Sequence, residues 1–207
     1  MMAYFPFFID IENKNCTIVG GGIVAARKAE VLINFGCNIA IISPAFCKEI
    51  KQLDNIKLVK REFILSDLEN SFFVIAATND PPLNAEISAF CRMKNILVNV
   101  VDVKEECSFI FPSIYKNKDI VAGITTSGKS PQVSALVRKT IAENVPPYYG
   151  EIVDRLGILR PLIKEQVSTQ HKRKEVFSLI LEEMLRTENK ISDKEIENII
   201  RGQNDEN

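Results

Sequence analysis

The sequence predicts an α/β fold in which helices cover both faces of a parallel sheet, followed by a hairpin and a helical C-terminal region. In the first half of the 207-residue chain, short and continuously apolar runs alternate with helix-like segments. Such runs are typical of parallel strands that are buried on both faces. From about residue 109 this alternation stops, and the end of the chain consists of charged amphipathic segments.

The first region should form five strands, because each apolar run is short and rich in β-branched residues. The helices between them should provide the crossover connections of a parallel sheet. The expected strands are residues 15–19, 38–43, 56–61, 72–77 and 96–101. The expected helices are residues 23–35, 46–53 and 83–94.

The later region predicts a hairpin and then helices. Residues 109–115 and 119–124 are rich in strand-forming residues and flank a polar loop at residues 116–118. A helix is expected over residues 131–144, with Ser130 as its N-cap and Pro131 as its first residue. Beyond Pro146-Pro147, the pattern indicates amphipathic helices to the end of the chain.

Composition and charge argue against several classes of protein. Hydrophobic residues make up 46% of the chain and charged residues 26%, which is typical of globular proteins. The formal net charge of -1 argues against a nucleic-acid partner. No apolar run is long enough to cross a membrane, and the apolar start lacks the basic residues of a signal peptide. We therefore expect a cytoplasmic protein with no membrane partner.

Cysteine and histidine residues give no metal signal. The odd number of cysteines and the absence of a C-x-x-C pair favour buried free thiols over a metal or redox site. The single histidine, His171, lies in a charged stretch, so no metal ligands are predicted. The cysteines are Cys16, Cys37, Cys47, Cys91 and Cys107.

A glycine-rich turn joins the first expected strand to the first helix. Residues 20–25, Gly-Gly-Gly-Ile-Val-Ala, match G-x-G-x-x-A inside a βαβ unit, which is the context that a Rossmann-type dinucleotide site requires. The glycines would allow a tight turn and close approach of the pyrophosphate to the helix N-terminus. The alternative is a purely structural glycine turn. The predicted cofactor-binding residues here are Gly20, Gly21, Gly22, Ile23 and Val24.

The second strand ends in Ser43-Pro44, where an acidic residue usually binds the ribose hydroxyls. No arginine follows that could hold a 2′-phosphate, so we expect NAD rather than NADP, with Ser43 and Pro44 in contact with it. Thr78 and Asn79 follow the fourth strand and are also expected to bind the cofactor. Asp80 precedes two prolines, which favours a helix N-cap over a catalytic acid.

Residues 123–130, Gly-Ile-Thr-Thr-Ser-Gly-Lys-Ser, match the P-loop pattern letter for letter. In a P-loop the lysine and serine lie in the first helical turn, whereas Pro131 disfavours helical geometry at Ser130. No later apolar strand ends in an aspartate that could hold magnesium. A nucleoside triphosphate site is therefore rejected.

Several blocks together resemble the N-terminal region of the siroheme synthases, the precorrin-2 dehydrogenase family. They occur in the family's order within roughly residues 3–145, while the region after Tyr148 matches poorly. The resemblance implies NAD-dependent oxidation of precorrin-2, a tetrapyrrole, to sirohydrochlorin, with ferrous iron insertion to siroheme in some members. The blocks are residues 20–28, 76–80, 83–84, 99–102, 108–113 and 127–131.

The resemblance also implies a homodimer and a division of the chain into three parts. Residues 1–112 would form the NAD-binding Rossmann domain, residues 113–145 the dimerisation hairpin and helix, and residues 146–207 a helical C-terminal domain. Thr126 aligns with a serine that can be phosphorylated in some relatives, and the resemblance leaves open whether this loop is regulated.

The implied reaction removes a hydride and a proton from a substrate that carries many carboxylates. Asp102 follows the fifth strand, at the edge where α/β sheets bind ligands, and its carboxylate could accept the proton. The alternative is that Asp102 only caps the turn. Ser127, Gly128 and Lys129 precede a helix N-terminus and are expected to bind substrate carboxylates. Lys129 as an ordinary exposed lysine is the alternative.

Two other functions stay open. One is a non-enzymatic NAD-sensing Rossmann module that regulates a partner, although such modules usually keep the acid that Ser43 replaces. The other is an NAD-dependent dehydrogenase for a different small anion. The hairpin and the Gly-Lys-Ser-Pro loop argue mildly against both.

Overall fold

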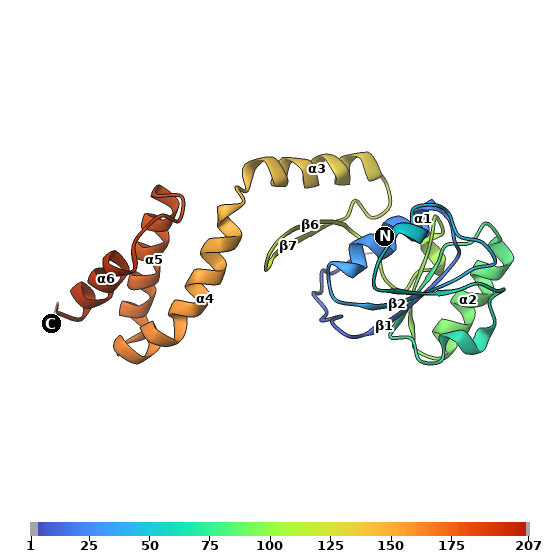
Figure 1. The fold of residues 1–207 in the computed structure, drawn as a ribbon, viewed down its shortest axis with the longest axis horizontal. Coiled ribbons are helices and arrows are strands. Elements are labelled where there is room, and N and C mark those ends of the chain that lie inside the picture. The colour runs from blue at the N-terminus through green and yellow to red at the C-terminus, as the bar shows by residue number, and fades with distance from the viewer. Residues whose placement is uncertain (1–3, 206–207) are drawn as a thin grey trace. The chain divides into compact units, whose positions relative to one another are not determined.

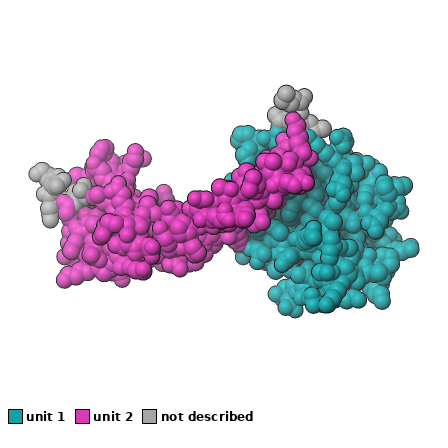
Figure 2. Space-filling model, turned by 90° about the horizontal axis from the view of Figure 1, so that it is seen from above, with its two compact units in different colours: residues 1–111 teal, residues 112–207 magenta. Residues whose placement is uncertain are grey.

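The computed structural model describes residues 4–205, with side chains to residue 202. The chain divides into two compact units, residues 1–111 and residues 112–207, which Figure 2 distinguishes by colour. No helix in the described part of the chain is both long and apolar enough to cross a membrane.

The first unit contains a five-stranded parallel sheet in the order β3-β2-β1-β4-β5. It is the unit in which Figure 1 labels β1, β2, α1 and α2. After β3 the chain crosses back past β2 and β1 to begin β4. The first strand, β1, and the fourth strand, β4, are therefore neighbours at the centre of the sheet. A parallel sheet binds ligands at such a crossover, beyond the carboxyl ends of its strands. The strands are β1 (Asn15–Val19), β2 (Asn38–Ile42), β3 (Ile56–Val59), β4 (Phe73–Ala76) and β5 (Leu97–Val100).

Helices on opposite faces bury both sides of this sheet. Helix α1 (Ile23–Ile33) packs a stripe of small side chains, mainly alanines, against a core that includes Ile18. Helix α2 (Pro81–Met93) packs against the core that includes Val19 on the other face. Ile18 and Val19 point to opposite faces because side chains alternate along a strand. The predicted α/β fold class is confirmed.

The expected helix at residues 46–53 is wrong. Only a 3₁₀ turn, η1 (Ile50–Gln52), forms in this segment. Phe46 and Cys47 are partly buried and Ile50 is fully buried, a spacing that imitates a helical face. The N–H of Cys47 instead donates to the carbonyl oxygen of Gly21 at 2.8 Å, so the segment is held as a loop against the glycine turn.

Two further 3₁₀ turns, η2 (Leu65–Leu68) and η3 (Lys104–Glu106), connect the later strands of this unit. The second unit begins with the antiparallel hairpin β6 (Ser113–Asn117) and β7 (Ile120–Ile124). Its turn is shorter than expected, because Lys116 and Asn117 pair with β7 and the chain reverses at Lys118, where φ is 52°.

Helix α3 (Pro131–Asn144) has the expected bounds, and the Ser130 hydroxyl accepts a hydrogen bond from the N–H of Val133, which confirms the N-cap. Three more helices follow: α4 (Tyr148–Gln166), α5 (Gln170–Arg186) and α6 (Asp193–Asp205). They share a core of their own, built around Ile163, Ile180 and Met184. The predicted helical C-terminal region is confirmed.

Candidate active site

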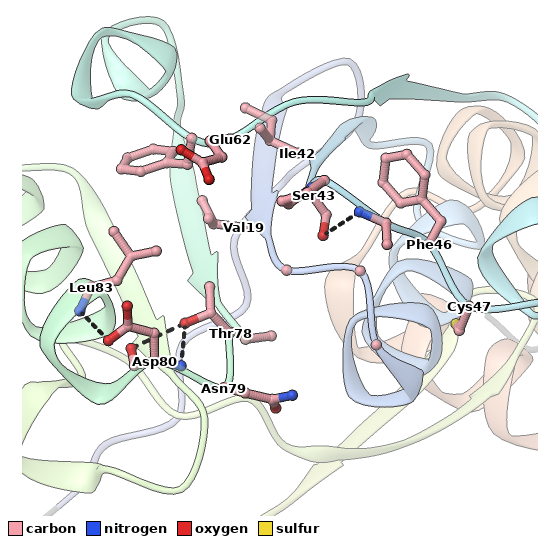
Figure 3. Close-up of a pocket in the computed structure, with 17 residues that line it drawn as sticks. Val19, Ile42, Ser43, Phe46, Cys47, Glu62, Thr78, Asn79, Asp80 and Leu83 are labelled. Carbon is pink, nitrogen blue, oxygen red and sulfur yellow. Dashed lines mark hydrogen bonds between the residues drawn. The ribbon is translucent and has the colours of Figure 1, made fainter.

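A cavity of about 760 Å³ opens beyond the carboxyl ends of the strands in the first unit (Figure 3). Four loops form its wall, those that follow β1, β2, β3 and β4, and its size is ordinary for a cofactor site. Seven of its lining residues are among the predicted cofactor-binding residues: Gly20, Gly21, Gly22, Ser43, Pro44, Thr78 and Asn79. Ile23 and Val24 do not line the cavity but lie exposed in the first turn of α1.

The glycine turn is clamped between the loops that follow β2 and β4. A Cβ atom on Gly21 would collide with the carbonyl oxygen of Ala45, and one on Gly20 with that of Ala77. Gly20 also has φ at 120°, in the region that favours glycine. Its N–H donates to the carbonyl oxygen of Ile42 at 2.9 Å. The first two glycines are therefore required by the packing of the turn itself.

Gly22 differs, because a Cβ atom there would meet nothing within 4 Å. Gly22 is the N-cap of α1, no side chain caps this end of the helix, and no acidic residue lies in its first turn. The first N–H groups of α1 thus remain available to an anion beside the cavity. The open space at Gly22 and the uncapped helix fit the pyrophosphate of a dinucleotide cofactor.

The loop after β4 is held by Asn84, a buried residue of the resemblance blocks to which the sequence analysis assigned no role. Its side-chain oxygen accepts from the Thr78 hydroxyl at 2.7 Å, and its amide donates to the Thr78 carbonyl oxygen at 3.1 Å. Asp80 accepts a hydrogen bond from the N–H of Leu83, as the N-cap prediction requires. The backbone around Thr78 and Asn79 is therefore fixed at the edge of the cavity.

Ser43 lies directly after β2 in the wall of the cavity. It is only 9% exposed, and its hydroxyl accepts from the N–H of Ala45 at 3.4 Å (Figure 3). Its side chain supports the turn after β2, and its contact with the cofactor stays a prediction.

Asp102 lies in the turn after β5, next to the strand that leads to the Thr78 loop. The N–H of Val101 donates to the carbonyl oxygen of Ala76 at 3.0 Å, which joins the two strand ends. Asp102 is exposed and has φ at 62°. Within residues 4–205 nothing forms a hydrogen bond with its carboxylate, so the turn-cap interpretation lacks support. Its catalytic role stays a prediction.

Lys28 on α1 is a second residue to which the sequence analysis assigned no role. Its amine donates to the Asn99 side-chain oxygen at 3.1 Å and lies 4.1 Å from the centroid of the Phe111 ring. Burial lowers the pKa of Lys28 from 10.5 to about 8, against the opposing influence of Cys107, Asp102 and Cys16. The signal was Asn99, a polar residue within an otherwise apolar strand.

The predicted substrate loop belongs to the second unit, between β7 and α3. Ser127 and Gly128 have φ at 57° and 78°, and Lys129 is exposed. The Thr126 hydroxyl closes the loop by bonding both the N–H and the carbonyl oxygen of Ser130. Ser130 thus lies outside the helix as its N-cap, which contradicts a P-loop. The substrate-binding role of Ser127, Gly128 and Lys129 stays a prediction.

Across residues 4–205 no group of three or more His, Cys, Asp or Glu residues is arranged to hold a metal ion. The five thiols are free, and Cys16, Cys37 and Cys91 are buried.

Comparison with known proteins supports a dinucleotide-binding fold. Residues 7–113 match the model of a family described as putative NAD(P)-binding. The chain is 35% identical over 189 residues to the siroheme synthase of Vesicomyosocius okutanii subsp. Calyptogena okutanii (strain HA), which covers 88% of this chain and 41% of that protein. It is 34% identical over 183 residues to the siroheme synthase of Sodalis glossinidius (strain morsitans), or 87% of this chain and 39% of that protein.

The chain therefore spans about two fifths of the length of these curated relatives. A solved structure of SirC, a precorrin-2 dehydrogenase, has the same fold. Its TM-score is 0.70 at 20% sequence identity, and the match covers 97% of this chain and 99% of that one.

Proposed function

The chain belongs to the family of putative NAD(P)-binding domains, and on this premise we propose that it is an NAD-dependent dehydrogenase that oxidises precorrin-2 to sirohydrochlorin. One observation carries the proposal. The glycine turn leaves an open, uncapped helix N-terminus at a cavity beyond the carboxyl ends of parallel strands. The similarity to siroheme synthases over most of the chain, and to the whole fold of SirC, supports this choice of substrate.

Different residues of the chain would bind the cofactor, accept the proton and bind the substrate during the oxidation. The first turn of α1 would bind the pyrophosphate, and the loop fixed by Asn84 would orient the other end of the cofactor. Bound NAD would supply the hydride acceptor. The carboxylate of Asp102 would take the proton that leaves the substrate, since no described hydrogen bond occupies it. Ser127, Gly128 and Lys129 would bind substrate carboxylates.

A homodimer and a cytoplasmic location belong to the same proposal. Helix α3 has no buried residue in the single chain, and Val133, Leu136 and Val137 are exposed on it. A second copy of the chain would cover these apolar side chains. The five free thiols are typical of a reducing compartment.

The test is to incubate the purified chain with precorrin-2 and NAD and to follow the absorbance of sirohydrochlorin and of reduced cofactor together. Equimolar formation of both products is expected. A chain that binds NAD but leaves precorrin-2 unchanged would contradict the proposed substrate and would favour an NAD-sensing module. Adding ferrous iron after the oxidation then tests for iron insertion, which the sequence resemblance implies for some members.

A further inference from the structure

The cavity has an acidic residue, Glu62, to which the sequence analysis assigned no role although it directly follows the third expected strand. Glu62 lines it from the loop after β3, and its carboxylate points into the cavity in Figure 3. The residue is exposed, and no described residue forms a hydrogen bond or ion pair with its side chain. Among the described residues that line the cavity, Asp80 is the only other acid, and its carboxylate already serves as the N-cap of α2.

The backbone of Glu62 is held in place by its neighbour. The Arg61 guanidinium binds both oxygens of Asp67, at 2.7 and 2.5 Å, and donates to the Glu62 carbonyl oxygen at 2.9 Å. Asp67 also accepts from the N–H of Ile64 at 3.0 Å. This bidentate pair closes the loop around Glu62, which presents the carboxylate from a braced segment.

The same pair engages the guanidinium of Arg61, the residue that directly precedes Glu62. The positive charge of Arg61 faces Asp67, and the pKa of the Asp67 carboxyl is lowered by that contact. None of the described residues that line the cavity is a lysine, arginine or histidine. A 2′-phosphate, which carries about two negative charges, would therefore meet a carboxylate and no counterion in this wall.

We propose that Glu62 binds the adenosine ribose hydroxyls of NAD and excludes NADP. It would take the role of the acidic residue that usually stands at the position of Ser43. The inference rests on the proposed function, because it assigns a specificity residue to the same cofactor site. A carboxylate accepts hydrogen bonds from both vicinal hydroxyls, which is how the acid after the second strand usually acts in such folds. Here the acid comes from the neighbouring strand end.

The experiment is isothermal titration of NAD and of NADP into the full chain and into two variants, Glu62→Gln and Glu86→Gln. Glu86 is an exposed acid on α2 that does not line the cavity, so it is the matched control. The parent should bind NAD more tightly than NADP. Loss of a charge-assisted hydrogen bond should weaken NAD binding to Glu62→Gln by about tenfold. The affinity of Glu62→Gln for NADP should fall less than its affinity for NAD, or should rise, so the preference for NAD over NADP becomes smaller. Glu86→Gln should bind both dinucleotides with the affinities of the parent.

The possible outcomes distinguish failure of the proposed function from failure of the role assigned to Glu62. A parent chain that binds neither dinucleotide would overturn the proposed function and this inference together. A parent that prefers NAD, with Glu62→Gln showing the same two affinities, would overturn the role of Glu62 alone. Melting temperatures of the three proteins should agree because both substituted side chains are exposed. The variant Glu62→Lys should bind NADP more tightly than NAD, because it places a positive charge where the 2′-phosphate would lie. Titrating both dinucleotides into this variant gives an independent check.

Discussion

The amine of Lys28 donates a hydrogen bond of 3.1 Å to the side-chain oxygen of Asn99, and this bond ties α1 to β5 across the sheet. Asn99 is itself fixed, because its amide donates to the carbonyl oxygen of Phe109 at 3.2 Å. Burial disfavours the charged form of the Lys28 amine, and its partner Asn99 carries no charge that could compensate. The pKa of Lys28 therefore falls to about 8.

This lowered pKa predicts a pH dependence of stability. In the unfolded chain Lys28 regains a pKa near 10.5, so between pH 8 and 10.5 the unfolded state binds more protons and the folded state becomes relatively more stable as pH rises. Lys28→Met removes this contribution. Between pH 8 and 9 the parent should gain about 1 kcal/mol of unfolding free energy relative to the variant, measured by urea denaturation. Parallel pH profiles for the two proteins would contradict the burial of this charge.

The glycine turn predicts opposite outcomes at two adjacent positions. Gly22→Asp should leave the melting temperature unchanged or slightly higher, because the site is open and aspartate is a good N-cap. It should nevertheless abolish NAD binding, since its charge would face the pyrophosphate. Gly21→Ala should destabilise the fold by about 2 kcal/mol or more, because its Cβ would collide with the Ala45 carbonyl. Calorimetry and thermal melts of both variants check this contrast, and NAD affinity retained in Gly22→Asp would sink the assignment.

Local sequence was sufficient for features that depend on nearby residues. The bounds of β1 and α3, and the N-caps Ser130 and Asp80, follow from short-range propensity and capping chemistry. The segment at residues 46–53 failed because a tertiary hydrogen bond to Gly21 outweighs its helical periodicity.

The roles of Lys28 and Glu62 depend on which strands and loops become neighbours, so no spacing along the chain could reveal them. The motif that predicted a cofactor site locates only the phosphate end of the cavity. Its remaining wall comes from loops far along the chain.

Asp102→Asn tests the proposed proton acceptor. Asparagine tolerates the left-handed backbone of this position, so the melting temperature should not change. Turnover of precorrin-2 should fall by about 10²–10⁴-fold, the usual value of general acid–base assistance, with NAD affinity unchanged. If Asp102 only supported its turn, the variant would instead oxidise precorrin-2 at close to the parent rate.

Leu136→Glu tests the proposed dimer. Leu136 is 62% exposed in the single chain, and a charge there should separate two copies that meet through α3. Light scattering at micromolar concentration should give twice the chain mass for the parent and for Leu136→Met, and about 23.3 kDa for Leu136→Glu. A parent chain that scatters as a monomer would rule the dimer out.

Because β1 and β4 are neighbours at the centre of the sheet, the cofactor site can form only late in folding. The glycine turn after β1 and the Thr78 loop after β4 become neighbours only when these two strands pair. Such long-range pairing closes a large loop and is slow compared with helix formation. During refolding, helical circular dichroism should therefore recover before the chain can change the fluorescence of added NADH, the reduced cofactor. Bound cofactor should in turn slow unfolding, because it bridges two segments whose separation breaks the sheet.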